Sequence, residues 1–305
     1  MKSKKIQGII PPMVTPLENQ DELDIEGLEK LIEHIINGGV HGLFVLGTTG
    51  EAQSLSYHLR YTLVDLAIKI VNGRIPVLAG VSDTSFVESL NFAKHAYHCG
   101  ASAVVSTPPY YYTPNQKELI NYFIAFADNS PLPLFLYNMP SHVKVNLDVE
   151  TVVNLSMHEN IIGLKDSSGN LLYFQEVVQA LKKVEDFSIL IGPEEMLMQS
   201  ILTGGHGGVI GGANMFPKLY VEMYGASVNR DLDRMNILQE KILKICSNIY
   251  SIGNSGGGYL PGLKAALCHL GICKNVLALP YSAFGENEIR EIQRKLDSMD
   301  LEEWI

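Results

Sequence analysis

Eight short apolar runs recur along the first three quarters of the chain, with longer amphipathic stretches between them. The runs are rich in Val, Ile and Leu and lack polar residues at alternate positions. This pattern is typical of strands buried on both faces of a parallel sheet. The predicted strands are Gly8–Val14, Gly42–Leu46, Pro76–Val81, Ala101–Ser106, Leu132–Asn138, Ile161–Lys165, Phe187–Ile191 and Gly207–Ile210.

Helical patterns follow these strands one by one. The first opens with Asp24 as a possible cap and closes at Gly38-Gly39. The others are Tyr57–Asn72, Ser85–His98, Gln116–Asp128, Asp148–Ser156, Leu171–Val184, Glu194–Thr203 and Pro217–Ser227. Eight strand–helix units in succession predict a (β/α)₈ barrel. The rival, an open doubly wound sheet, needs a Gly-rich phosphate turn after the first strand, and "PPMVTPLEN" is not one.

The alternation stops after the eighth unit. Three helical patterns and no strong strand pattern occupy the rest of the chain, at 231–250, 260–271 and 286–299. We therefore expect a (β/α)₈ catalytic barrel over residues 1–228 and a C-terminal helical region over residues 229–305.

Composition and charge narrow the class of protein. The 305 residues are 46% hydrophobic and 18% charged, which is ordinary for a soluble globular protein. The formal net charge of −10 speaks against nucleic acid as a main partner, because phosphate binding needs a basic face. A small anionic substrate stays open, since local groups can hold it.

The cysteines and the apolar segments indicate the compartment. The four cysteines, Cys99, Cys246, Cys268 and Cys273, form no C-x-x-C pair and have no His cluster beside them, so we expect no zinc site. No secretory signal pattern opens the sequence, and no apolar run reaches transmembrane length. These features predict a cytoplasmic protein with reduced thiols and no membrane partner.

The stretch "IIGLKDSSGN" places a lysine, Lys165, at the end of a run that otherwise reads as a buried strand. An ammonium is costly to bury, and desolvation lowers its pKa. The resulting neutral amine can attack a carbonyl and form a Schiff base. Alternatively, Lys165 extends its amine to solvent or pairs with Asp166.

Other polar residues follow the strand ends, where the active sites of barrels lie. "GTTGE" offers hydroxyls and a turn whose N–H groups suit a carboxylate, although an ordinary strand-to-helix turn has the same composition. Tyr137 ends a strand and can act as a general acid and base, or can be a core tyrosine with one hydrogen bond. "PPYYY" supplies adjacent tyrosines for a site, for a subunit contact or for simple packing.

The motifs GTTGE, PPYYY, YNMP, GLKD and GGVIGGAN occur in this order. In order and spacing, the chain resembles the dihydrodipicolinate synthase / N-acetylneuraminate lyase family over nearly its whole length. That family consists of class I, Schiff-base-forming, pyruvate-dependent aldolases on a (β/α)₈ barrel with a C-terminal helical region, and its members are commonly tetramers built from two tight dimers. The resemblance therefore implies a pyruvate-dependent aldolase and a homotetramer.

The resemblance also implies a role for residues that match the family motifs. Lys165 matches the imine-forming lysine, and Tyr137 the tyrosine that moves protons to and from the substrate oxygen. Thr48 and Thr49 match the pair that holds the pyruvate carboxylate, with the Thr48 hydroxyl in a relay with Tyr137. Tyr111 matches a tyrosine that completes this relay from the other subunit of the tight dimer.

Substrate-binding matches follow from the same comparison. Ile210 matches a residue whose backbone lines the pyruvate end. Ser167 lies where lyases and keto-deoxy sugar acid aldolases place a hydroxyl for the acceptor chain. Glu194 and Glu195 stand where sialic acid lyases read Asp-Glu, and we expect them to accept hydrogen bonds from sugar hydroxyls. The alternative is that they only favour a helix N-terminus.

The sequence departs from the synthase pattern at His142. Synthases have an arginine there for the carboxylate of aspartate semialdehyde, and a mostly neutral imidazole cannot offer the same two-pronged contact. Loss of a charged hydrogen bond costs about 1.5–3 kcal/mol. His142 is alternatively a rim residue without ligand contact. An aspartate directly after the lysine, here Asp166, resembles the sequences of sugar acid aldolases and dehydratases more than those of synthases.

Together these features predict a lyase that cleaves or forms a 2-oxo-4-hydroxy acid, of the 2-keto-3-deoxy sugar acid or sialic acid type. Neither metal nor organic cofactor is required, because the protonated imine is the electron sink. Three alternatives remain: dihydrodipicolinate synthase proper, a keto-deoxy sugar acid dehydratase, and a non-catalytic 2-oxo acid sensor.

Overall fold

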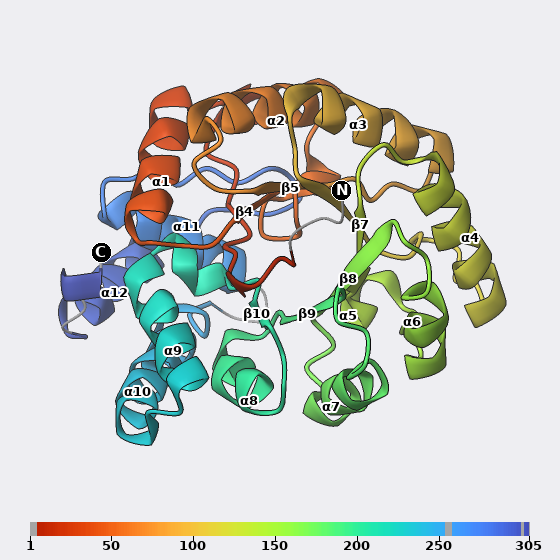
Figure 1. Ribbon diagram of the computed structural model, residues 1–305. Helices are drawn as coiled ribbons and strands as arrows, with labels where there is room; N and C mark the ends of the chain where they lie inside the picture. Colours follow the sequence, from red (N-terminus) through yellow and green to blue (C-terminus); the bar gives the residue numbers. More distant parts are fainter. Residues whose placement is uncertain (1–4, 254–257, 300–301, 305) are drawn as a thin grey trace.

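The eight predicted strands form one parallel sheet in the computed structural model, which describes residues 5–253, 258–299 and 302–304 (Figure 1). The strands are β1 (Gly8–Ile9), β4 (Leu43–Val45), β5 (Val77–Gly80), β6 (Ala103–Ser106), β7 (Leu134–Asn138), β8 (Ile161–Asp166), β9 (Ser188–Ile191) and β10 (Gly207–Gly208). Their order is β1-β10-β9-β8-β7-β6-β5-β4. A parallel bridge between Pro12 and Phe44 joins the two edges, so the predicted (β/α)₈ barrel is confirmed.

Helices surround the strands on the outside of the barrel (Figure 1). They are α1 (Ile25–Asn37), α2 (Tyr57–Val71), α3 (Phe86–Cys99), α4 (Gln116–Asn129), α6 (Val149–Leu155), α7 (Leu171–Ala180), α8 (Leu197–Leu202) and α9 (Pro217–Asn229). Asp24 does cap α1, because its side chain accepts a hydrogen bond from the Gly27 amide. Such caps satisfy amides that the helix leaves unpaired.

Three local features differ from the prediction. The helix predicted from Glu194 begins as a 3₁₀ turn, η2 (Glu194–Met196), before α8. A short helix, α5 (Pro140–Val143), follows β7. The strands β2 (Leu17–Asn19) and β3 (Glu22–Leu23) form a small antiparallel hairpin. All are too short for hydrophobic periodicity to reveal them.

The residues of each barrel strand alternate between two separate cores. On β4, Phe44 lies among the side chains inside the barrel, whereas Leu43 and Val45 belong to the core between strands and helices. The inner cluster consists of Ile10, Phe44, Leu78, Ala103, Val105, Phe135, Tyr137, Ile162, Leu190 and Val209. This alternation decides which side chains face the interior.

The C-terminal region is helical, as predicted, with α10 (Leu232–Ile249), α11 (Tyr259–His269), α12 (Glu286–Asp297) and the 3₁₀ turn η4 (Glu302–Trp304). In Figure 1, α10 lies beside α9, and these two helices contact each other. A buried ion pair ties this region to the barrel: Lys264 Nζ of α11 lies 2.5 Å from Glu51 Oε1, and both side chains are fully buried. The division at residue 228 remains a prediction; α9 ends at Asn229 and α10 begins at Leu232.

Candidate active site

Lys165 and Tyr137 are paired neighbours on β8 and β7, and both point into the barrel. Only 5% of Lys165 is exposed, and its Nζ lies 4.0 Å from the centre of the Tyr137 ring. The Phe44 ring centre lies 5.0 Å from the same nitrogen. Aromatic faces attract a cation weakly, but they do not replace its hydration.

Strand geometry explains why the lysine is buried. Gly163 pairs with Phe135 one layer below the pair formed by Lys165 and Tyr137. A Cβ at Gly163 would lie 2.2 Å from the Phe135 ring, so the glycine leaves room for that ring. The Lys165 side chain therefore rests above a filled hydrophobic layer, near the carboxyl end of its strand. The alternative in which Lys165 extends its amine to solvent is therefore wrong.

The alternative pairing of Lys165 with Asp166 is wrong. Asp166 faces the opposite way, because side chains alternate along a strand. Its carboxylate accepts hydrogen bonds from Asn138 Nδ2 at 2.9 Å and from the Ser168 amide and hydroxyl at 3.1 and 3.0 Å. Within residues 5–253, 258–299 and 302–304, no carboxylate forms an ion pair with Lys165.

The environment shifts the pKa of both groups. Burial lowers the pKa of the Lys165 amine, and the nearby Tyr137 phenol offsets part of this effect. Burial by itself raises the pKa of Tyr137. The positive charge of Lys165 and hydrogen bonds with Thr48 and Ser167 outweigh burial, so that the net pKa lies below its usual value. Burial thus raises the share of neutral amine, and the phenol beside it can give and take a proton, which suits carbonyl addition with proton transfer.

The loop after β4 brings both threonines to this group. Thr48 Oγ1 lies 3.2 Å from Tyr137 Oη, and Thr49 Oγ1 lies 3.2 Å from Tyr259 Oη. The amides of Gly50 and Glu51 donate back to Gly47 and Thr48 carbonyls. In the part of the chain that the structure describes, the Thr48 and Thr49 amides have no acceptor. Free amides in such a turn are suited to a carboxylate.

Two further predicted residues lie at the same end of the barrel. Ser167 follows β8 and is half-buried, with its hydroxyl close enough to Tyr137 to lower the phenol's pKa. Ile210 is fully buried at the start of the 3₁₀ turn η3 (Gly211–Asn214), directly after β10. Ser167 thus borders the group formed by Lys165, Tyr137 and Thr48, and a place for Ile210 beside the substrate remains a proposal.

Tyr111 does not reach the site of its own chain. Its side chain is 97% exposed, and its φ of 91° is unusual for a residue with a side chain. Tyr111 lies in the loop after β6, at the carboxyl end of the barrel, where its exposed side chain is free to contact another subunit. That role remains a proposal.

The acceptor-side residues are spread over different environments. His142 is exposed on α5, with Nδ1 2.9 Å from the Ser141 hydroxyl. Partial burial of its ring and the neighbouring Lys144 lower its pKa, which favours the neutral imidazole. Glu195 is exposed, whereas only 5% of Glu194 is exposed.

Glu194 is engaged in a network that the sequence did not reveal. Its Oε2 accepts from the Gly212 amide at 2.7 Å, and its Oε1 accepts from Tyr220 and Tyr250 at 2.5 and 3.2 Å. Burial raises the pKa of this carboxyl, against the effect of those hydrogen bonds. The structure thus gives the Glu194 carboxylate internal partners and does not bring it to the group around Lys165.

Tyr259 is the main residue that the sequence analysis missed. It lies at the start of α11, its ring packs against Tyr250 at 4.9 Å, and its hydroxyl reaches Thr49. A Cβ at Gly211 would lie 1.8 Å from the Tyr259 hydroxyl, so this glycine admits the tyrosine. No local signal in the sequence connects Tyr259 to Thr49, because the contact spans 210 positions.

The family model described as the dihydrodipicolinate synthetase family matches residues 5–299. The chain belongs to this family. A solved structure of dihydrodipicolinate synthase from the commensal bacterium Bacteroides thetaiotaomicron is 52% identical, with a TM-score of 0.94 over 96% of this chain and 98% of the other. The family consists of lyases and aldolases, so the chain is an enzyme of this class.

Other relatives in the family carry different names. The probable 2-dehydro-3-deoxy-D-pentonate aldolase YjhH of Escherichia coli is 35% identical over 79% of this chain and 81% of the relative. YagE of E. coli, a prophage protein of the dihydrodipicolinic acid synthase family solved with pyruvate, is 29% identical, with a TM-score of 0.91 over 97% of this chain and 99% of the other.

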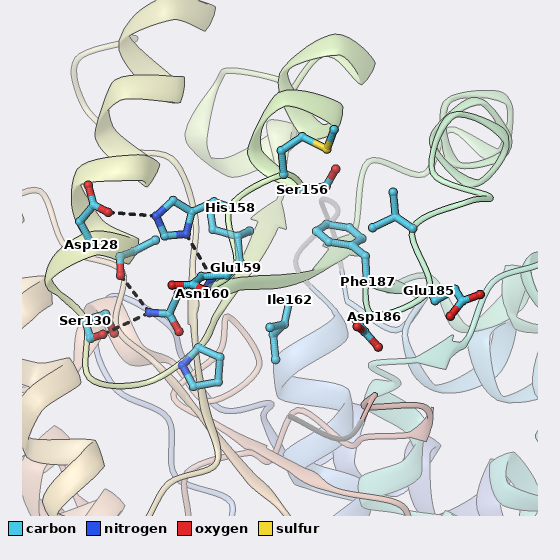
Figure 2. Close-up of a pocket in the computed structure, with 15 residues that line it drawn as sticks. Asp128, Ser130, Ser156, His158, Glu159, Asn160, Ile162, Glu185, Asp186 and Phe187 are labelled. Carbon is cyan, nitrogen blue, oxygen red and sulfur yellow. Dashed lines mark hydrogen bonds and ion pairs between the residues drawn. The ribbon is translucent and has the colours of Figure 1, made fainter. Parts of the chain in front are cut away.

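A hollow of about 860 Å³ lies at the opposite end of the barrel, at the amino-terminal ends of β7, β8 and β9 (Figure 2). Its polar side chains bond mainly to one another and to nearby backbone: His158 Nε2 contacts Asp128, and Asn160 Nδ2 donates to the Ala127 and Ser130 carbonyls. Active sites of barrels form at the carboxyl ends, and the amino-terminal face serves stability. In this family member, the candidate site is therefore the group around Lys165.

Proposed function

We propose that the chain is a class I lyase that forms a Schiff base between Lys165 and pyruvate, or a 2-oxo acid that yields pyruvate. The observation that carries the proposal is the buried Lys165 amine, without a carboxylate partner, against the Tyr137 phenol. A buried amine of lowered pKa is an activated nucleophile. The relatives named as synthase and aldolase, and the pyruvate complex of YagE, agree with it.

In the proposed reaction, the Lys165 amine adds to C2 of the 2-oxo acid, and water leaves as the imine forms. The amides and hydroxyls of Thr48 and Thr49 hold the carboxylate, and the backbone at Ile210 lines the same end. Tyr137 takes the proton of the C4 hydroxyl while the C3–C4 bond breaks, and the C4 fragment leaves as an aldehyde. The enamine is protonated, and hydrolysis releases pyruvate and free Lys165. No cofactor takes part, because the protonated imine accepts the electron pair.

The acceptor half is proposed to be a 2-keto-3-deoxy sugar acid or a sialic acid. The neutral His142 supports this reading, because it offers no cation to a second carboxylate. Ser167 is the proposed hydroxyl for the acceptor chain. Glu195, exposed in the 3₁₀ turn η2, keeps its proposed role toward sugar hydroxyls, whereas the internal partners of Glu194 make a direct contact less favourable.

Dihydrodipicolinate synthase activity is the second candidate. The specific observation in its favour is the 52% identity to the Bacteroides thetaiotaomicron protein that carries this name. It would condense pyruvate with aspartate semialdehyde at the same Lys165 imine.

A substrate panel distinguishes the two candidates. Pyruvate release from N-acetylneuraminate and several 2-keto-3-deoxy sugar acids is measured with a lactate dehydrogenase couple. Release from one of them establishes the lyase and identifies the acceptor. No release from any, together with condensation of pyruvate and aspartate semialdehyde, establishes the synthase. A sugar acid that loses water without releasing pyruvate indicates the dehydratase alternative.

We also propose a cytoplasmic homotetramer, a dimer of dimers, in which Tyr111 enters the partner's site. The four free cysteines support the compartment, and the exposure of Tyr111 supports the exchange. Within the described residues, no helix combines the length and hydropathy needed to cross a bilayer.

Replacement of Tyr111 by Phe tests the exchange. Tyr111→Phe should lower kcat roughly 10²-fold, the lower range for a lost proton-transfer group, without changing the oligomer. Tyr112, which is 87% exposed in the same loop, provides the matched control, and Tyr112→Phe should keep full activity. Equal activity of both variants would remove Tyr111 from the mechanism.

A further inference from the structure

Three side chains of different chemistry meet on the outer surface, between α2 and α3. Asp65 belongs to α2, and His95 and Cys99 lie four residues apart on one face of α3. One ligand atom from each lies within 4.8 Å of the other two, and among the described residues this is the one such group of three. The last turn of α3 leads into the amino-terminal end of β6, so the cluster lies at the end of the barrel opposite to Lys165.

The distances within this Asp65–His95–Cys99 cluster are close to those of a coordination shell. His95 Nε2 lies 2.6 Å from Asp65 Oδ1, Cys99 Sγ lies 2.9 Å from the same oxygen, and Sγ lies 3.4 Å from Nε2. Tetrahedral zinc with bonds of 2.0–2.3 Å separates such ligand atoms by roughly 3.3–3.6 Å. The sulfur–nitrogen edge already has this length, and the two other edges need to open by less than about 1 Å.

The donor set selects the kind of ion. A thiolate and an imidazole are ligands for zinc and similar borderline-soft ions, whereas magnesium and calcium prefer oxygen alone. His95 is oriented by rings on both helices: Tyr61 of α2 lies 4.5 Å away, and Phe92 of α3 stacks at 6.2 Å. A hollow of about 530 Å³ borders Asp65 and Cys99 and leaves room for a water as fourth ligand.

We propose that Asp65, His95 and Cys99 bind a zinc-class divalent ion that clips α2 to α3, independently of the reaction at Lys165. On binding, the Cys99 thiol releases its proton to solvent and the sulfur donates its electron pair to the ion. Neutral His95 shifts its proton from Nε2 to Nδ1 through solvent, which ends its hydrogen bond to Asp65. Nε2 and the Asp65 oxygen then each donate an electron pair to the ion, and no oxidation state changes.

Cobalt titration of the reduced, metal-free, full-length protein tests the site. One equivalent of Co²⁺ should produce a thiolate-to-cobalt charge-transfer band and tetrahedral visible bands, and Zn²⁺ should displace them. Cys99→Ser should abolish the charge-transfer band, and His95→Gln should weaken Co²⁺ binding at least tenfold. Cys268, an exposed cysteine of α11, is the matched control, and Cys268→Ser should keep the full spectrum.

A thermal measurement accompanies the titration. At a Zn²⁺ concentration about tenfold above Kd, the Tm of the unaltered protein should rise by roughly 2 °C, and that of Cys99→Ser should not change. Turnover should be the same with and without Zn²⁺. Absence of a thiolate band at one equivalent, or an equal band in Cys99→Ser, would overturn the proposal.

Discussion

Lys165 inside the barrel and Lys264 at the junction with the C-terminal region are both buried, but only Lys264 has a carboxylate partner. Lys165 is 5% exposed, and its amine faces aromatic rings and forms no ion pair with any residue that the structure describes. Lys264 is fully buried, pairs with Glu51 and also donates to the Val276 carbonyl at 2.5 Å. Burial lowers the pKa of both amines, but only Lys264 has a carboxylate that opposes this effect.

The difference shows how position, rather than residue type, decides whether a buried lysine reacts or supports the fold. A paired and hydrogen-bonded ammonium is held in its charged form, and removal of one partner leaves a buried charge. An unpaired amine above a hydrophobic layer keeps its lone pair available for a carbonyl. Glu51 also joins the barrel to the C-terminal region through a second contact, because its carboxylate accepts a hydrogen bond from the Ala278 amide at 2.7 Å.

The largest expected effect follows from replacing the unpaired lysine. Lys165→Met should abolish the borohydride-trapped pyruvate adduct and lower kcat/KM by on the order of 10⁴-fold or more, as for other removed nucleophiles. Stability should not fall, since a methionine fills the same space without burying an amine. Mass spectrometry after borohydride treatment measures the adduct. An adduct on this variant would place the imine at another lysine.

The paired lysine should give the reverse result. Lys264→Met leaves the Glu51 carboxylate buried without a cation and should lower the free energy of unfolding by about 3–5 kcal/mol. The folded variant should still form the pyruvate adduct at Lys165. Urea denaturation followed by circular dichroism measures the loss, and Glu51→Gln in the same chain should restore part of it. Unchanged stability of Lys264→Met would show that the pair does not hold the junction.

A smaller effect is expected where the C-terminal region touches the site. Tyr259→Phe removes the hydrogen bond to Thr49 and should cost about 0.5–1.5 kcal/mol in carboxylate binding, a few-fold to tenfold increase in KM for the 2-oxo acid. The rate at saturation should change less, because Tyr137 and Lys165 remain in place. Steady-state kinetics separate the two parameters. A loss confined to kcat would argue that Tyr259 takes part in proton transfer instead.

The smallest expected effect concerns the pH dependence of imine formation at Lys165. Imine formation needs the neutral amine, so its rate should rise with pH and level off once Lys165 is deprotonated. Because burial lowers the pKa of Lys165 below 10.5, the half-point should fall below that value. Adduct trapping between pH 6 and 11 measures it. A half-point at or above 10.5 would mean that the amine is not desolvated in solution.

Much of this architecture could be predicted from local patterns. The pattern predicts the strand Ile161–Lys165 because residues buried on both faces are apolar throughout, and the structure extends it to Asp166. The helix at Gln116–Asp128 is predicted from its period, and in the structure a capping box begins α4. The motif GLKD and its companions indicated Lys165, Tyr137 and Thr48, and the structure brings these three together.

Other parts depend on contacts that no local pattern encodes. Glu194 reads as a residue of a helix start that could face a substrate, yet its hydrogen bonds are to Gly212, Tyr220 and Tyr250. Tyr259 stands directly before the predicted helix at 260–271, yet its hydroxyl reaches Thr49. The zinc-class cluster joins Asp65 to His95 and Cys99 only because α2 and α3 pack side by side.

The sequence by itself therefore determined the order of strands and helices, the barrel class and the candidate nucleophile, because short-range periodicity or a contiguous motif encodes each of them. Tertiary structure alone decided that Lys165 is unpaired while Lys264 is paired, and that Asp166 and Glu194 turn away from the substrate side. The physical reason is that the charge state and reactivity of a buried group depend on its neighbours in space, and in this fold those neighbours come from distant strands and helices.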